Sequence, residues 1–247
     1  MKRLHLLLLL LAIALDTAAQ NGKKISFNAR AGFSIGAAAP AGIPASIRKI
    51  ESYKPGFQPS LEAGLGYRFS THFGFATGLR WEQKGMTTDA RVKAYYTTFN
   101  EAGSDGHESV TGYFTGRVKT RVRNSYLTLP LHLTYHNNSS FTFKAGGFVS
   151  LLLDNRFEGD ARDGYIRNES PVGEREDIDA ASYDFSENVR KINAGIEIGT
   201  DYRINTSLFA SANLNYALTP LMEPGFRSID FGMHHIYLNL GIGYRFH

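Results

Sequence analysis

The sequence contains no cysteine, which excludes a disulfide framework, a thiolate metal site, a cysteine nucleophile and a lipid anchor on cysteine. It has only one long apolar run, Leu4 to Leu15, and its mean hydropathy is -0.25. A membrane-spanning helix needs roughly 18 or more apolar residues, so helical spans are excluded and a membrane role requires a β-barrel. The net charge of +4 gives no reason to expect nucleic-acid binding, and the chain carries no motif for a cofactor or a metal.

The N-terminus has the pattern of a secretory signal peptide. A basic start at Lys2 precedes the apolar run, and Ala19 offers a small-residue cleavage site. A membrane anchor is the alternative, but the run is only about twelve residues long and ends at Asp16, which is too short to span a bilayer. We therefore expect residues 1–19 to be removed and residues 20–247 to form one exported domain.

Alternation of apolar residues with polar or small ones is the strongest pattern in the rest of the chain. In LEAGLGYRF (61–69), one face carries Leu, Ala, Leu, Tyr and Phe, and the other carries Glu, Gly, Gly and Arg. Alternation with period two predicts a strand that separates an apolar surface from a polar one. Eight segments show it, near residues 25–36, 61–69, 73–82, 121–136, 140–153, 189–204, 206–218 and 234–246.

The connections between these segments are short and long by turns. Residues 70–72, 137–139 and 205–206 form tight turns, whereas 37–56, 86–120, 154–188 and 219–233 are long. An antiparallel meander places successive connections at opposite ends of the sheet. The sequence therefore predicts an all-β fold, an eight-stranded antiparallel up-and-down transmembrane β-barrel with short periplasmic turns and long extracellular loops. A soluble periplasmic barrel with its apolar face inside is the alternative.

The less apolar face of the strands combines charged residues with many glycines, which favours a narrow barrel interior over a surface exposed to water. Eight strands leave an interior just wide enough for side chains to fill, so we expect the charges to pair in a packed network. We predict that this lumen network contains Arg30, Glu62, Arg80, Lys144 and Glu197. An aqueous path for ions or small solutes is the competing interpretation of the same charges.

The aromatic residues of the apolar face gather at the short-turn ends of the strands, which predicts a girdle at the membrane boundary. The near-repeated segments GLGYRF (64–69) and GIGYRF (241–246) both end a strand at this level. Alternation points each Tyr outward and the Arg that follows it into the lumen. We expect the periplasmic girdle to contain Tyr67, Phe69, Phe73, Tyr135, Tyr202, Tyr244 and Phe246.

Six segments cover nearly all of the predicted strands: NARAGFSIG (28–36), GFQPSLEAGLGYRFSTHFGFATGLRWEQKGM (56–86), NSYLTLPLHLTYH (124–136), FTFKAGGFVSLLL (141–153), INAGIEIGTDYRI (192–204) and HIYLNLGIGYRF (235–246). Their most specific pieces are Gln83-Lys84-Gly85, Leu129-Pro130-Leu131 and the terminal Tyr-Arg-Phe. Together they resemble the PorT-like outer-membrane β-barrel family.

The resemblance implies an eight-stranded barrel in a Gram-negative outer membrane, with both termini on the periplasmic side, and it implies little chemistry. The partners it implies are outer-membrane lipid and the assembly machinery that reads an aromatic C-terminal strand. His247 departs from that pattern because it follows Phe246 at the end of the chain.

Pro130 falls inside the predicted strand 121–136, on its lumen side. Proline cannot donate a ladder hydrogen bond and is normally confined to edges and bulges. A closed barrel has no edge, so we expect a local bulge at this position.

The long loops are the segments most open to a specific function. The loop 154–188 has eleven acidic residues and four arginines, but it lacks the spacing of a calcium-binding loop. We therefore expect a solvated acidic loop rather than a cation site. The loop 86–120 is rich in aromatic residues, which either form a binding surface or extend the neighbouring strands beyond the membrane.

The histidines, among them His107 and His132, lie outside any nucleophile or metal motif, so we expect no catalytic residues. The sequence thus predicts a non-enzymatic outer-membrane barrel whose surface loops bind an extracellular or envelope ligand or serve an envelope-structural role. A small porin-like conduit is the alternative function, and an outer-membrane lipid-modifying enzyme is a weaker one.

Overall fold

The computed structural model describes residues 24–40, 42, 44–101, 109–137, 140–168, 170–229 and 231–246. The predicted signal peptide, His107 and His247 lie outside these residues. Across the described ranges, no helix is long and apolar enough to cross a membrane.

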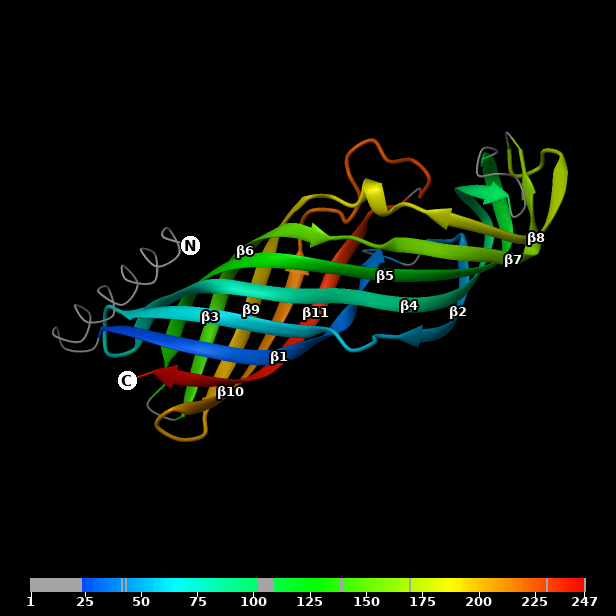
Figure 1. Cartoon of the computed structure of the whole chain (residues 1–247). Coiled ribbons are helices and arrows are strands. Elements are labelled where there is room, and N and C mark those ends of the chain that lie inside the picture. Colours follow the sequence, from blue (N-terminus) through cyan, green and yellow to red (C-terminus); the bar gives the residue numbers. More distant parts are fainter. Residues whose placement is uncertain are drawn as a thin grey trace, which may run out of the picture.

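Eight strands of the described chain close into an antiparallel ring (Figure 1). Neighbouring strands of the ring pair with each other, and the first strand pairs with the last to complete the circle. The eight-stranded up-and-down barrel is therefore confirmed. Its strands are β1 (Ile25–Pro40), β3 (Pro59–Arg68), β4 (Phe73–Glu101), β5 (Ser109–His136), β6 (Phe141–Asp154), β9 (Ile192–Arg203), β10 (Leu208–Ala217) and β11 (Met233–Phe246).

The two faces of the barrel wall differ as the alternation predicts. Outward positions are apolar and exposed, with Leu61 at 58 %, Leu131 at 62 % and Ile198 at 57 % relative exposure. Inward positions are polar or charged and buried, with Arg80 and Glu82 both at 0 %. A belt of exposed leucine, isoleucine and phenylalanine around a charged interior is stable only where lipid surrounds it. The barrel is therefore inside out relative to a soluble one.

Pro130 lies on the lumen side as expected, but the predicted bulge is wrong. Thr77 of β4 pairs with Leu131 of β5 and Arg80 of β4 pairs with Thr128 of β5, so the register is the same before and after the proline. Its pairing with Phe148 on β6 is also in register. The strand tolerates the proline because the ladder lacks only one donor there. The Pro130 carbonyl oxygen still accepts a hydrogen bond from the Thr77 hydroxyl at 2.7 Å.

The long connections contain more structure than the sequence suggested. They add β2 (Ile47–Lys54), β7 (Phe157–Arg167), β8 (Arg175–Asp184) and the short 3-10 helix η1 (Ser186–Asn188). The expected solvated acidic loop is wrong, because most of 154–188 is the β7–β8 hairpin. Its carboxylates lie mainly on the exposed side, while Phe157, Ile178 and other apolar residues are buried on the opposite side.

Strands β4 and β5 continue together beyond the barrel as a long ribbon, paired from Phe73 with Tyr135 to Asn100 with Ser109. This confirms the interpretation of residues 86–120 as strand extensions. Figure 1 shows the ribbon running to the end of the molecule that carries β7 and β8, far from the C-terminus. There, β8 also pairs with the tip of β4, so β4, β5, β7 and β8 close on themselves.

The closed ribbon surrounds an apolar core of its own, which we call the cap core. Its buried residues include Phe99, Phe114, Val118, Ala161, Ile166, Ile178 and Tyr183. Two irregularities bend the ribbon around this core, and each places a residue other than glycine at positive φ: Ala94 at 51° and Asp163 at 54°. Such bulges increase local twist and allow a two-stranded ribbon to curl.

Candidate functional sites

The aromatic residues of the barrel exterior meet across neighbouring strands at the short-turn end. Phe73 lies opposite Tyr135, Tyr202 opposite Phe141, and Phe246 opposite Phe27. Ring centroids of the first two pairs lie 5.3 and 5.0 Å apart. The predicted girdle residues Tyr67, Phe69, Phe73, Tyr135, Tyr202, Tyr244 and Phe246 are all exposed, between 41 and 53 %.

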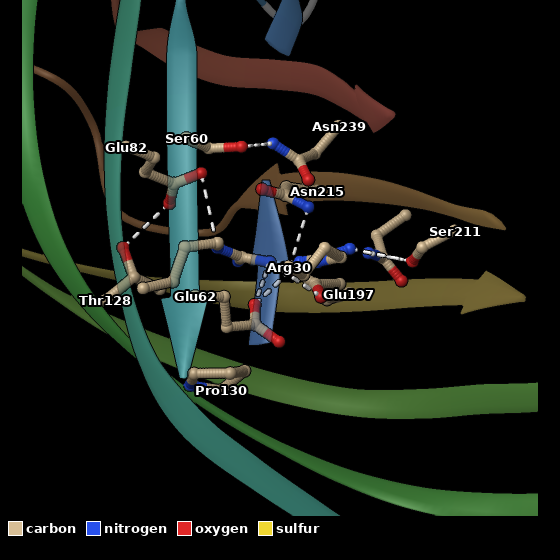
Figure 2. A network of polar contacts seen from close by, with 12 residues as sticks. Arg30, Ser60, Glu62, Glu82, Thr128, Pro130, Glu197, Ser211, Asn215 and Asn239 are labelled. Carbon is tan, nitrogen blue, oxygen red and sulfur yellow. Dashed lines mark hydrogen bonds and ion pairs between the residues drawn. The ribbon is translucent and has the colours of Figure 1, made fainter. Parts of the chain in front are cut away.

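Inside the barrel, Arg80 is the centre of a buried ion-pair cluster. Its guanidinium lies 2.6 Å from a carboxylate oxygen of Glu197, 3.4 Å from Glu62 and 3.4 Å from Glu82. Figure 2 shows the three glutamates, which come from β9, β3 and β4, directed into a common interior. Several carboxylates around one arginine satisfy a charge that burial would otherwise destabilise strongly.

Arg30 extends the cluster towards the short-turn end. It pairs with Glu62 at 2.6 Å and donates a hydrogen bond to the Ser211 hydroxyl at 2.7 Å (Figure 2). Lys144 contacts the same hydroxyl at 3.4 Å and pairs with Asp201 at 2.6 Å. The structure thus brings Arg30, Glu62, Arg80 and Glu197 into direct contact, whereas Lys144 joins them only through Ser211.

Lys84 belongs to the same interior and was missed in the sequence. It pairs with Glu82 at 3.1 Å, and its ammonium lies 5.6 and 5.0 Å from the ring centroids of Tyr126 and Phe148. The signal was available, because the alternation of β4 continues beyond Glu82 and places Lys84 on the lumen side. The sequence interpretation ended that strand too early.

Neutral polar residues complete the lumen, and charge patterns alone did not reveal them. Asn215 donates to Glu197 at 2.7 Å, and the Thr128 hydroxyl donates to Glu82 at 2.7 Å. Asn239 donates to Ser34 and Ser60 at 2.9 and 2.8 Å. These residues occupy the spaces between the ion pairs, so side chains pack the lumen at mid-height.

Two of the described histidines, His132 and His235, lie inside the lumen. His132 lies 3.1 Å from Glu197 in the buried cluster, and His235 packs edge-on against Tyr126. Neither reaches the lipid-facing surface, since their relative exposures are 5 and 1 %. Within the ranges that the structure describes, no group of three or more His, Asp or Glu side chains is arranged to hold a metal ion.

A cleft of about 780 Å³ opens at the end of the molecule opposite the girdle. Tyr96 and Tyr113 from the ribbon form one wall, with ring centroids 5.3 Å apart in an edge-to-face contact. The connection from β10 to β11 supplies the other wall, including Phe226 and Phe231, and Arg190 lies at the margin. We call this the aromatic cleft.

The model of the outer membrane protein beta-barrel domain family matches residues 18–223. The chain belongs to this family. The protein is thus an outer-membrane β-barrel, with its short turns in the periplasm and its ribbon, cap core and aromatic cleft outside the cell. No curated protein sequence matches the chain significantly.

Solved structures similar to this outer-membrane barrel share little sequence with it. Ail of Yersinia pestis, in complex with the heparin analogue sucrose octasulfate, is 13 % identical over 90 % of this chain and 97 % of its own, with a TM-score of 0.35. Neisserial surface protein A is 13 % identical over 91 and 98 %, with a TM-score of 0.31. OprG of Pseudomonas aeruginosa is 13 % identical over 90 and 96 %, with a TM-score of 0.33.

The extracellular cap of the outer-membrane barrel is anchored by Tyr183 of β8. Its hydroxyl lies 2.6 Å from the Thr120 hydroxyl on β5, and its ring packs against Phe99 and Phe185. Burial raises the pKa of the Tyr183 phenol well above its ordinary value. The neutral phenol is therefore part of the folded cap.

Proposed function

We propose that this protein is a non-enzymatic, PorT-like outer-membrane barrel that binds an extracellular or envelope ligand with the aromatic cleft of its cap. The observation that carries the proposal is the cap itself. Its four paired strands and buried apolar core hold the cleft walls on a rigid scaffold, which is the usual setting for a binding site.

The chemistry of the cleft favours a ligand with aromatic or apolar groups. Tyr96, Tyr113, Phe226 and Phe231 supply large contact surfaces that lose little conformational entropy on binding. Arg190 is held by its hydrogen bond to the Pro220 carbonyl at 3.0 Å, and with Arg227 and Glu223 it gives the lining of the cleft a net positive charge. A polypeptide or glycan surface that presents a ring and a nearby acidic group fits this combination.

A porin-like conduit is less well supported, because the barrel interior is filled at mid-height. Arg80 and Glu82 of β4 and Tyr237 of β11 are all fully buried in the lumen. Eight-stranded barrels of this kind have interiors that side chains fill. We expect the conductance of planar bilayers containing the purified protein to stay near background. Sustained unitary currents that change with Arg80→Gln would favour the conduit.

A lipid-modifying enzyme is also less well supported. Such an enzyme needs a nucleophile and a base at the lipid-facing surface, whereas His132 and His235 lie inside the lumen and His72, at the periplasmic boundary, stacks on the girdle residue Tyr135. We further propose that outer-membrane lipid contacts the girdle, and that the assembly machinery recognises β11, the strand that closes the barrel between β1 and β10.

The binding proposal is tested with printed arrays of glycans and of aromatic peptides, probed with the full-length barrel in lipid nanodiscs. We expect retention of at least one probe class above empty nanodiscs, and its loss in the variants Tyr96→Ala and Phe231→Ala. Val172→Ala is the matched control, because Val172 is an apolar residue that is 88 % exposed and lies outside the cleft. Retention that survives both cleft substitutions, or an array with no signal, would contradict the proposal.

A further inference from the structure

The periplasmic end of the lumen is hollow, in contrast to its packed middle. Two adjoining cavities of about 190 and 900 Å³ lie there and share Arg68, Arg203, Arg245, His136 and Asp201 among their lining residues. Lys144 lines the larger one. We call the combined space the periplasmic vestibule. The ion pairs of Arg30 and Arg80 close its inner end, so the vestibule communicates with the periplasm rather than with the cell exterior.

The charge of the vestibule is strongly one-sided. Arg68, Arg203, Arg245 and Lys144 are cationic, and Asp201 is the acidic residue of the lining. Asp201 is already engaged, because the Lys144 ammonium lies 2.6 Å from its carboxylate. Among the residues that the structure describes, none of the three arginines forms an ion pair with a carboxylate. Three guanidinium groups, of which Arg68 and Arg203 are exposed and Arg245 is partly buried, therefore line one cavity whose single carboxylate is already paired with Lys144.

A repeated dipeptide builds this arrangement. Tyr67-Arg68 ends β3, Tyr202-Arg203 ends β9, and Tyr244-Arg245 lies one residue before the end of β11. These strands all run towards the periplasm, and alternation directs each tyrosine to the lipid boundary and each arginine into the lumen. The same alternation that forms the girdle therefore places three arginines in the lining of the vestibule.

We propose that the periplasmic vestibule is a binding site for a phosphate-class oxyanion. Guanidinium groups bind phosphate through paired N–H donors, and several of them in a partly enclosed cavity favour a multiply charged anion over chloride. The Arg245 guanidinium is positioned over the Phe209 ring, 5.8 Å from its centroid, which restricts its motion. His136 and Thr142 add further hydrogen-bonding groups and contact each other at 3.0 Å. The bound group belongs either to a free phosphate compound of the periplasm or to a lipid headgroup of the inner leaflet.

The test is calorimetric titration of the full-length barrel in zwitterionic detergent micelles. Inorganic pyrophosphate and sodium chloride are compared at equal ionic strength, and dihexanoyl phosphatidate represents a lipid headgroup. We expect saturable binding of pyrophosphate or phosphatidate, weakened about tenfold or more by Arg68→Gln, Arg203→Gln or Arg245→Gln. Tighter binding of phosphatidate assigns a lipid source, and tighter binding of pyrophosphate assigns a free anion.

Arg123→Gln is the matched control, since Arg123 is an exposed arginine on the outer face of β5 near the cap. Titrations that match chloride, or that weaken equally in this control, would overturn the proposal. If a vestibule variant fails to fold, amide chemical shifts of the wild-type barrel decide instead. Changes confined to Thr142, Arg203 and their neighbours support the site, and changes centred on Arg123 contradict it. Loss of the aromatic cleft has no bearing on either result.

Discussion

Replacing Arg80 by methionine should destabilise the barrel more than any other single change in the lumen. Before the change, the cations Arg30, Arg80 and Lys84 balance the carboxylates of Glu62, Glu82 and Glu197. Afterwards two cations face three carboxylates in a buried space. Removing one member of a buried ion pair costs about 3–5 kcal/mol, because the remaining charge stays desolvated.

Removing the Arg80 guanidinium leaves Glu197 with the fewest remaining partners. Glu62 keeps Arg30 at 2.6 Å, and Glu82 keeps Lys84 at 3.1 Å. Glu197 keeps only the Asn215 amide at 2.7 Å and His132 at 3.1 Å. The variant Glu197→Gln removes that charge while retaining the shape, and we expect it to cost less, about 1–3 kcal/mol for a lost charged hydrogen bond. The double variant restores the balance and should be less destabilised than the sum of the two single changes, by roughly 2 kcal/mol.

Urea unfolding in detergent micelles measures these differences, and the single tryptophan, Trp81, is the fluorescent reporter on the adjoining outward position of β4. Arg123→Met serves as a control, because an exposed arginine outside the lumen should change stability by no more than about 0.5 kcal/mol. A cost below about 1 kcal/mol for Arg80→Met, or strict additivity in the double variant, would refute the view that this cluster is a coupled, desolvated unit.

Three further predictions concern other parts of the molecule. Because folding raises the pKa of Tyr183, its contribution to stability is present below the unfolded pKa of about 10 and is lost as pH rises above that value. Hydrogen exchange of β7 and β8 should therefore accelerate above about pH 10. The variant Tyr183→Phe should remove this pH dependence. Ala94→Gly should stabilise the cap by about 1 kcal/mol, since φ is 51° at this position, and a fall in the thermal midpoint would contradict this. Trp81 faces outward opposite Leu61 on the lipid-facing wall, so brominated lipids should quench its fluorescence, and fluorescence equal to that in unbrominated lipids would contradict this placement.

The barrel could be predicted from the sequence because each strand carries its own evidence. Alternation is a local property of about ten residues. One face of the strands carries charged residues such as Arg80 and Glu197 and so faces the lumen. The other face carries residues such as Leu61 and Leu131 and so faces the lipid. The strand order then follows from short turns between sequence neighbours. Only local patterns and one topological rule were needed.

The cap could not be predicted in the same way, because its order depends on distant partners. The β7–β8 hairpin has a high acidic content, and its apolar side is buried only where it meets β5 and the tip of β4. Charge counts suggested a solvated loop for this reason. Asn215 and Asn239 were missed on similar grounds, since an asparagine in a strand gives no indication of what it will meet across the barrel.

The Tyr-Arg repeat links membrane anchoring to the chemistry of the lumen. A girdle alone requires only a tyrosine near the end of each strand that runs towards the periplasm. The next residue could be small, as are Gly66 and Gly243, which precede two of the Tyr-Arg dipeptides. This chain instead places arginine there three times, at the open mouth of the lumen, where Arg68 and Arg203 are exposed and Arg245 is partly buried. In the barrel middle the two buried arginines, Arg30 and Arg80, each have a carboxylate partner. The three arginines at the periplasmic mouth, of which Arg245 is the most buried, keep donors available for the proposed oxyanion.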